Sequence, residues 1–122
     1  MIVAAGAGTR LGGVPKQYRE LAGEPVLRRT IEAFTAHPDI GGVKVVINSD
    51  HTPLYEQAVH GLTLLPPALG GETRQQSVRN GLEALLVERA PANVLIHDAA
   101  RPFVSAQLIQ LVLEGLKQHS AV

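Results

Sequence analysis

The chain has 122 residues, of which 45% are hydrophobic and 18% charged, so its size and composition are those of one globular domain with a core of its own. Its 11 basic residues balance its 11 acidic residues, and with only 3% aromatic residues nothing indicates a nucleic-acid partner or a membrane surface. The absence of cysteine excludes disulfides and thiolate metal sites. Because no apolar run reaches the roughly 18 residues that span a bilayer, we expect a cytoplasmic protein.

Hydrophobic periodicity predicts alternating strands and helices along the first half of the chain. Residues 1–4 form an apolar run that predicts a first strand. Pro25 suits the first position of a helix, and apolar residues recur after it at helical spacing. The β-branched run 43–47 predicts a second, buried strand. Residues 52–60 predict a short helix, and residues 62–65 predict a third strand that two prolines then end.

The second half of the chain continues the alternation. Residues 73–88 predict a helix, residues 93–97 a fourth strand, and Ser105 caps a last helix that extends to Leu116. The side chains expected on the inner faces are Val78, Leu82, Leu85 and Leu86 in the first of these helices, and Leu108, Ile109, Val112 and Leu116 in the second. This alternation predicts an α/β fold in which helices cover both faces of a sheet of parallel strands. Ligands of such folds bind beyond the carboxyl ends of the strands.

A glycine-rich segment follows the first predicted strand and has the composition of a polyphosphate-binding loop. Gly6 and Gly8 let the backbone approach phosphate oxygens closely, and successive backbone N–H groups in such a turn form an anion-binding concavity. Two cations, Arg10 and Lys16, come next in the chain. Fixed cations in this position can neutralise the charge that develops during phosphoryl or nucleotidyl transfer.

Two well-known phosphate motifs do not fit this segment. A Walker A loop requires Gly-Lys followed by Ser or Thr, whereas Lys16 follows Pro15. A dinucleotide-binding fingerprint requires a third glycine, and Leu11 occupies that position while Gly12 comes one residue late. Gly13 and Pro15 also oppose an immediate long helix. We therefore expect residues 5–18 to form an extended, mostly non-helical loop around a ligand.

Three sequence blocks together carry a family resemblance. The first is Ala-Ala-Gly-Ala-Gly-Thr-Arg-Leu-Gly at 4–12 with Pro-Lys-Gln-Tyr at 15–18, the second is Gly-Gly-Glu-Thr-Arg-Gln-Gln-Ser-Val at 70–78, and the third is His-Asp-Ala-Ala-Arg-Pro at 97–102. The chain resembles the Rossmann-like nucleotidyltransferases, and within them the CTP-using family of 2-C-methyl-D-erythritol 4-phosphate cytidylyltransferases. The first block alone is shared in looser form by many sugar and cofactor nucleotidyltransferases, whereas Pro-Lys-Gln-Tyr and His-Asp-Ala-Ala-Arg-Pro together are much more specific. The match extends over essentially the whole chain in order.

The resemblance implies a Rossmann-like, three-layer α/β/α nucleotidyltransferase fold with a largely parallel sheet. It also implies the reaction, in which a phosphate oxygen of a polyol phosphate attacks the α-phosphorus of CTP and pyrophosphate leaves. By this resemblance, Arg10 and Lys16 are the catalytic residues that stabilise the transition state. The residues implied in nucleotide binding are Ala4, Ala5, Gly6, Ala7, Gly8, Thr9, Gly71, Glu72 and Ser77. The residues implied in binding the acceptor are Asp98, Ala99 and Arg101.

Other polar residues near these blocks have alternative interpretations. Asp98 follows a predicted strand and also suits Mg²⁺, or another divalent cation, directly or through water. Arg101 either holds Asp98 or meets the substrate phosphate, and Arg74 is either a site residue or a solvated helix charge. Glu72 stands where the family commonly has Asp, which leaves its role less defined. His97 is interpreted as a packed strand-end residue, and the other histidines are expected at the surface: His37, His51, His60 and His119.

The resembled family is longer than this chain. We therefore expect residues 1–122 to be the nucleotide-binding part of a single cytidylyltransferase domain that is truncated at its C-terminus. The absent half is expected to make a homodimer, and fusion to a cyclodiphosphate synthase domain is a further expectation. Three alternatives remain: a transferase for another polyol phosphate such as ribitol 5-phosphate or for another sugar phosphate, a nucleotide-binding fragment without turnover, and, disfavoured by its glycine spacing, a dinucleotide-dependent oxidoreductase.

Overall fold

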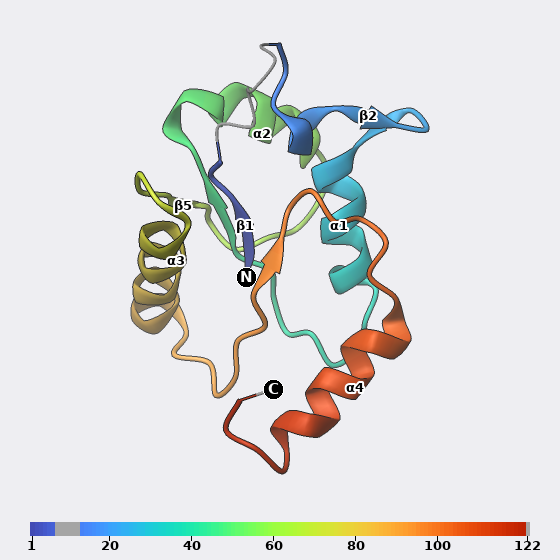
Figure 1. Ribbon diagram of the computed structural model, residues 1–122, viewed down its shortest axis with the longest axis vertical. Coiled ribbons are helices and arrows are strands. Elements are labelled where there is room, and N and C mark those ends of the chain that lie inside the picture. The colour runs from blue at the N-terminus through green and yellow to red at the C-terminus, as the bar shows by residue number, and fades with distance from the viewer. Residues whose placement is uncertain (7–12, 122) are drawn as a thin grey trace.

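The structure is a computed structural model, and it describes residues 1–6 and 13–121 (Figure 1). The strands are β1 (Ile2–Ala4), β2 (Glu20–Leu21), β3 (Glu24–Pro25), β4 (Val45–Ile47), β5 (Ala68–Leu69) and β6 (His97–Asp98). The α-helices are α1 (Val26–Thr35), α2 (Thr52–Ala58), α3 (Arg74–Glu88) and α4 (Ala106–Leu116). Two short 3₁₀ helices, η1 (Lys16–Tyr18) and η2 (Ser49–His51), complete the elements. In the described part of the chain, no helix is both long and apolar enough to cross a membrane.

The main sheet has four strands in the order β5-β4-β1-β6, and every pairing in it is parallel. Ile2 is aligned with Val45 on one side and with His97 on the other, so β1 is central. The chain first moves outward from β1 through β4 to β5, and then returns to place β6 on the opposite side of β1. The order therefore reverses between β1 and β6, and in doubly wound folds such a switch point marks the ligand crevice.

Helices cover both faces of this sheet, as the sequence predicts: α3 lies on one face, and α1 and α4 lie on the other (Figure 1). Side chains alternate between the two faces along a strand. Val45 and Ile47 therefore belong to the core cluster that contains Leu27 of α1, whereas Val46 belongs to a separate cluster on the α3 side. The predicted three-layer α/β/α arrangement is confirmed.

Helix α1 buries the residues expected from its periodicity: Leu27, Thr30, Ile31 and Phe34. A small antiparallel hairpin of β2 and β3 precedes it, with a two-residue turn at Ala22 and Gly23. Both turn residues have positive φ (53° and 87°), as hairpins of this length favour. The sequence analysis did not predict this hairpin.

The predicted inner face of α3 is wrong in part. The buried residues of this helix are Ser77, Gly81 and Leu85, while Leu86 is 65% exposed. Gly81 allows this close packing, because a Cβ placed there would lie only 2.6 Å from Cγ2 of Val46. Helix α3 therefore packs on the sheet largely through small residues. The spacing of its leucines does not predict which face of the helix makes this contact.

Two predicted strands are shifted in the structure. Residues 62–65 form no strand, and the third strand is β5, which follows Pro66 and Pro67. The Leu65 N–H still donates to the Val43 carbonyl at 3.1 Å, but Pro66 and Pro67 have no backbone N–H and interrupt the ladder, so strand pairing begins only at Ala68. The fourth strand is His97–Asp98 in place of 93–97, and it therefore lies within the third sequence block.

Two further predictions on individual side chains are corrected. In α4 Ile109 is buried as expected, but Leu108 is 52% exposed and Leu113 packs against the core in its place. His37 is buried, and its Nδ1 accepts the backbone N–H of Asp39 at 3.1 Å in the turn after α1. A histidine that satisfies a local turn in this way has no need of solvent.

Candidate functional site

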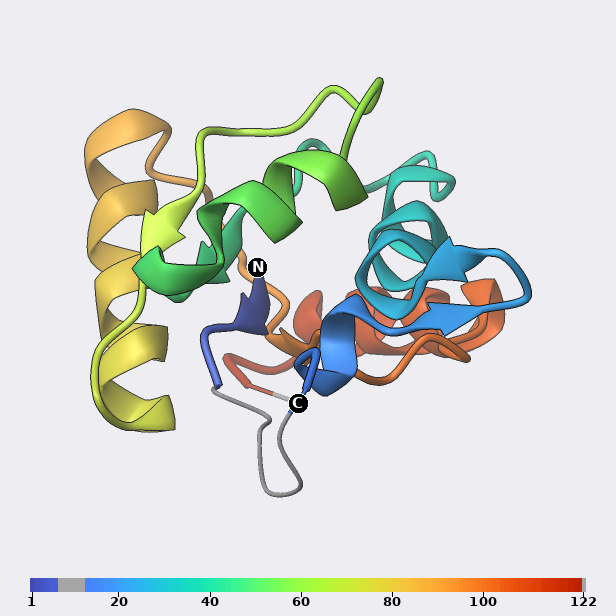
Figure 2. The ribbon, with the colours of Figure 1, turned by 90° about the horizontal axis from the view of Figure 1, so that it is seen from above.

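A cavity of about 530 Å³ lies at the carboxyl edge of the sheet. Figure 2 shows the ribbon from the side of this edge. This volume is within the range of ordinary small-molecule sites. Its walls come from the end of β1, the segment of η1, the turn between β5 and α3, and the residues after β6. The sequence-predicted site residues that line it are Ala4, Ala5, Gly6, Lys16, Gly71, Glu72, Ser77, Asp98, Ala99 and Arg101. The structure thus gathers residues from all three sequence blocks around the switch point.

The remaining predicted site residues fall outside the described residues. They are Ala7, Gly8, Thr9 and Arg10. Arg10 therefore remains a prediction from sequence, while its partner Lys16 lies in the cavity wall.

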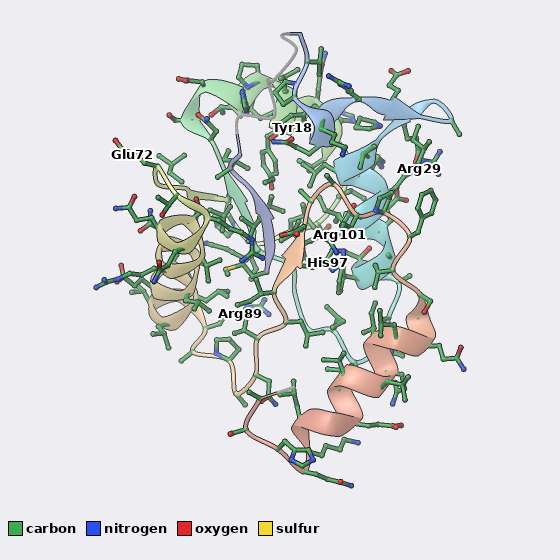
Figure 3. All side chains as sticks on the ribbon, viewed as in Figure 1. Tyr18, Arg29, Glu72, Arg89, His97 and Arg101 are labelled. Carbon is green, nitrogen blue, oxygen red and sulfur yellow. The ribbon has the colours of Figure 1, made fainter. Side chains whose placement is uncertain are left out.

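The turn between β5 and α3 is held by its own side chains. Ser77 is buried, and its Oγ accepts the backbone N–H of Gly71 at 3.1 Å. The Glu72 N–H donates to Oε1 of Gln76 at 3.0 Å, and Thr73 caps the helix by accepting the Gln76 N–H at 3.1 Å. Glu72 itself is exposed at the outer end of this turn (Figure 3). The turn is therefore fixed before any ligand arrives.

The backbone of this turn also lies close to the end of β1. A Cβ at Gly70 would lie 2.7 Å from Ser77 Oγ and would overlap the Cβ of Ala5. Only a residue without a side chain permits this approach. The first and second sequence blocks therefore meet directly at Gly70.

Asp98 is paired with two arginines at the mouth of the cavity. Its Oδ1 accepts hydrogen bonds from Nη2 of Arg74 at 3.0 Å and from Nε of Arg74 at 3.3 Å. Its Oδ2 lies 3.4 Å from Nε of Arg101. Because all three side chains are partly or largely exposed, these pairs contribute little to folding stability. A guanidinium carries five N–H donors, so each arginine keeps donors for a phosphate. Arg101 pairs with Asp98, and Arg74 is a second partner of the same carboxylate, while contact of Arg101 with a substrate phosphate stays a prediction.

His97 lies behind this group as a packed residue, as the sequence analysis expected. Its ring meets Phe34 edge to face with the centroids 5.1 Å apart, and its Nε2 donates to the Arg101 carbonyl at 2.9 Å. Figure 3 shows His97 and Arg101 close together beside β6. The contact orients the backbone that carries Arg101.

The η1 segment contains a residue to which the sequence analysis assigned no role. Gln17 is only 5% exposed, and its Nε2 donates to the carbonyls of Ala4 at 2.9 Å and Gly6 at 3.0 Å. A polar residue inside the Pro-Lys-Gln-Tyr block, next to a predicted catalytic lysine, was the one signal available.

The next residue, Tyr18, is buried too, and burial, with a smaller effect of Tyr55, raises the pKa of its phenol to about 12.

The described residues contain no group of three or more His, Cys, Asp or Glu that could enclose a metal ion. Asp98 is a single carboxylate, and both of its oxygens already face arginines. One carboxylate fits a Mg²⁺ ion held mainly by phosphate oxygens and water, which is how this ion is usually held in nucleotide sites. It does not fit an ion held by protein groups alone.

Comparison with known proteins gives a consistent result. The sequence model of the family described as IspD, 2-C-methyl-D-erythritol 4-phosphate cytidylyltransferase, matches residues 1–122. The chain is 54% identical over 122 residues to the bifunctional enzyme IspD/IspF of Rhodopseudomonas palustris (strain BisA53), covering 99% of this chain and 30% of the relative. It is 51% identical over 120 residues to the bifunctional enzyme IspD/IspF of Paramagnetospirillum magneticum, covering 98% and 31%.

The fold is also similar to solved structures. The crystal structure of 4-diphosphocytidyl-2C-methyl-D-erythritol synthase from Anaerococcus prevotii superimposes with a TM-score of 0.82 at 28% identity. The match covers 97% of this chain and 49% of the synthase. The chain thus spans about half of the solved synthase, and less than a third of the bifunctional relatives.

Proposed function

The chain belongs to the 2-C-methyl-D-erythritol 4-phosphate cytidylyltransferase family, and on that premise we propose that the whole protein transfers a cytidylyl group from CTP to 2-C-methyl-D-erythritol 4-phosphate. The products are 4-diphosphocytidyl-2-C-methyl-D-erythritol and pyrophosphate, in non-mevalonate isoprenoid precursor synthesis. The observation that carries the proposal is the cavity at the switch point, where residues of all three sequence blocks meet. Residues 1–122 are the nucleotide-binding part of that enzyme.

The parts of the cavity suit the parts of the two substrates. The end of β1, with the glycine-rich segment and Lys16, receives the triphosphate. The rigid turn at Gly71 and Ser77 receives the cytosine and ribose, since a glycine backbone can lie flat against a base. Asp98 and Arg101, at the end of β6, receive the acceptor. The acceptor phosphate is thereby brought toward the α-phosphorus across the β1–β6 switch point.

The reaction forms one P–O bond and breaks another. A phosphate oxygen of the acceptor bonds to the α-phosphorus, the bond from that phosphorus to the bridging oxygen breaks, and pyrophosphate leaves with the electron pair. The attacking group is already an anion, so the site needs cations and alignment more than a proton acceptor. Lys16 supplies a point charge and Arg10 a planar fork for this purpose.

Mg²⁺, or another divalent cation, is the proposed cofactor, with Asp98 as its protein ligand. The ion supplies neutralisation of phosphate charge when bound. Asp98 would hold the ion, directly or through water, in exchange for an arginine contact. The exposure of the carboxylate allows that exchange.

The remaining proposals concern the whole protein. Because two relatives of this chain are named bifunctional IspD/IspF enzymes, we propose that the protein is fused to a cyclodiphosphate synthase domain. We also propose a cytoplasmic homodimer whose dimer contacts lie beyond residue 122.

The test is turnover by the encoded full-length protein, measured as pyrophosphate release with CTP, UTP or GTP and with methylerythritol phosphate or ribitol 5-phosphate. We expect CTP and methylerythritol phosphate to be the preferred pair. Lys16→Met and Arg10→Ala should each lower kcat by about 10²- to 10³-fold, whereas the exposed Lys117→Met, matched in chemistry, should not change it. A preference for ribitol 5-phosphate or for another nucleotide would refute the assignment.

A further inference from the structure

Gln17 is a buried polar side chain placed at the wall of the cavity. One atom of it, Nε2, reaches two carbonyls of a different segment, at Ala4 and Gly6. Both carbonyls can only accept a hydrogen bond, so the nitrogen of the amide, and not its oxygen, must face them. An amide nitrogen has two hydrogens, and here both have an acceptor. The orientation of the side chain is therefore fully determined.

The two carbonyls lie where β1 leaves the sheet. Up to Val3 the sheet itself provides partners, since the Val3 carbonyl accepts the Ala99 N–H at 3.0 Å. The ladder ends at Ala4. Ala4 is buried, so its carbonyl needs another donor, whereas Gly6 is exposed and its carbonyl can also be solvated. Gln17 provides that donor. It thereby fixes the peptide units from residue 4 to residue 6, the first part of the glycine-rich segment.

The same contact fixes the segment that carries Lys16. Residues 15–19 form a compact turn, in which Tyr18 N–H donates to the Pro15 carbonyl at 2.9 Å and Arg19 N–H to the Lys16 carbonyl at 3.2 Å. Because the turn is rigid, holding Gln17 against β1 also sets the distance between the Lys16 backbone and the end of β1. The two walls that receive the triphosphate are thus joined through one amide.

We propose that Gln17 is a positioning residue for nucleotidyl transfer, which holds the Lys16 segment in register with the phosphate-facing end of β1. This inference rests on the proposed function. It assigns a kinetic role to a residue that touches neither reacting group. The opposing explanation is that Gln17 only fills the space between η1 and the sheet, in which case its loss affects stability alone.

The test uses the full-length protein and four variants. Gln17→Glu keeps the shape but replaces the donor with an oxygen that repels both carbonyls, and Gln17→Met keeps the volume without any donor. Gln17→Asn keeps the donor on a shorter side chain. Gln107→Met makes the same change of side chain as Gln17→Met at an exposed position in α4. Circular dichroism at the assay temperature establishes the folded fraction of each.

We expect kcat per folded molecule to fall by about 100-fold in Gln17→Glu and Gln17→Met, because an ångström of misplacement in a transfer site costs about that much. KM for the polyol phosphate should change less than about threefold, since its proposed contacts are on β6. Gln17→Asn should recover part of the rate, and Gln107→Met should match the wild type. The inference is overturned if folded Gln17→Met keeps a wild-type kcat, or if kcat falls only as much as the folded fraction.

Failure of the proposed function gives a different result, namely a wild-type protein that does not use CTP and the polyol phosphate at all. In that case hydrogen exchange, which needs no activity, tests whether Gln17 joins the end of β1 to the Lys16 segment. Loss of amide protection confined to residues 4–6 and 16–19 in Gln17→Met supports the joining of these two segments. Unchanged exchange in both segments refutes it.

Discussion

Gly70→Ala is the substitution for which the structure makes the most detailed prediction. A Cβ at this position overlaps the Cβ of Ala5 and lies 2.7 Å from Ser77 Oγ. The Ala5 Cβ is attached directly to the backbone of the segment after β1, so it cannot rotate away. The clash must therefore separate the β5–α3 turn from the end of β1, and it must move the Ser77 hydroxyl that holds the Gly71 N–H.

The expected magnitude follows from two opposing effects. Overpacking of this kind costs about 1–3 kcal/mol, and replacing glycine returns about 0.4–1 kcal/mol through the unfolded state. We therefore expect a net loss of about 1–2 kcal/mol in the free energy of unfolding. Displacing Ser77 should in addition weaken CTP binding by about tenfold, which corresponds to about 1.4 kcal/mol.

Two other glycines provide matched controls. A Cβ at Gly41 meets nothing within 4 Å, so Gly41→Ala should raise stability by about 0.4–1 kcal/mol through the unfolded state and leave CTP binding unchanged. A Cβ at Gly81 lies 2.6 Å from Val46 Cγ2, below the site, so Gly81→Ala should lower stability without a comparable loss of CTP affinity. Part of its cost is offset by about 1 kcal/mol of helix propensity.

Urea unfolding and calorimetric titration with CTP measure the two quantities for all three variants. The reasoning is refuted if Gly70→Ala binds CTP as tightly as the wild type, since the turn and β1 would then separate without moving the site. It is also refuted if Gly81→Ala weakens CTP binding as much as Gly70→Ala, because the effect would then come from general loosening of α3.

Three further predictions concern charge, pH and packing. Asp98→Asn removes the charge that holds two exposed arginines. It should lower kcat/KM about 10- to 100-fold and change the free energy of unfolding by less than about 1 kcal/mol. A loss of stability that equals the loss of transition-state stabilisation would contradict this prediction. Burial raises the pKa of Tyr18 to about 12 and that of Tyr55 above its usual range, whereas unfolded tyrosines ionise near pH 10. The folded state then retains protons that the unfolded state loses, so stability should fall as pH rises from about 10 to 12. Absorbance at 295 nm should show phenolate appearing only together with unfolding, and a separate step near pH 10 in the folded protein would contradict it. In urea unfolding, Leu85→Ala should lower the free energy of unfolding by about 2–4 kcal/mol, and Leu86→Ala should lower it by less than about 0.5 kcal/mol. Equal losses would mean that both leucines face the core, as the sequence pattern predicts.

The sequence was most informative where local chemistry alone decides the structure. Buried β-branched residues at Val45–Ile47 specify a strand with helices on both faces. Phosphate binding by the glycines and cations after β1 stays a prediction. The position of the three blocks at strand ends followed from the alternation of elements, and it sufficed to predict that Lys16, Ser77 and Asp98 would line one cavity.

Sequence patterns failed where contacts between distant segments decide the outcome. Helix α3 packs on the sheet through Ser77 and Gly81, two residues that contribute nothing to an apolar stripe. Strand β6 is only His97–Asp98, because its extent is set by pairing with β1 nearly a hundred residues earlier and not by the apolar run before it. A hydrophobic pattern predicts only which side chains leave water. It predicts neither close packing through small residues nor the extent of pairing between distant strands.

The buried polar residues show why the cavity edge holds its shape. The described residues include five buried polar or charged side chains, and three of them, Gln17, Thr30 and Ser77, contact backbone at or just beyond strand ends. Gln17 holds the end of β1, Ser77 the end of β5 through Gly71, and the Thr30 hydroxyl donates to the Ala99 carbonyl at 2.8 Å after β6. A parallel sheet satisfies its interior backbone by itself, but at its carboxyl edge the ladders end and each strand needs an outside partner. Because these partners come from η1, α1 and α3, the elements around the sheet also fix the geometry of the edge where we propose that the nucleotide binds. This accounts for polar residues in a core where an apolar side chain of equal size would leave those backbone groups unpaired.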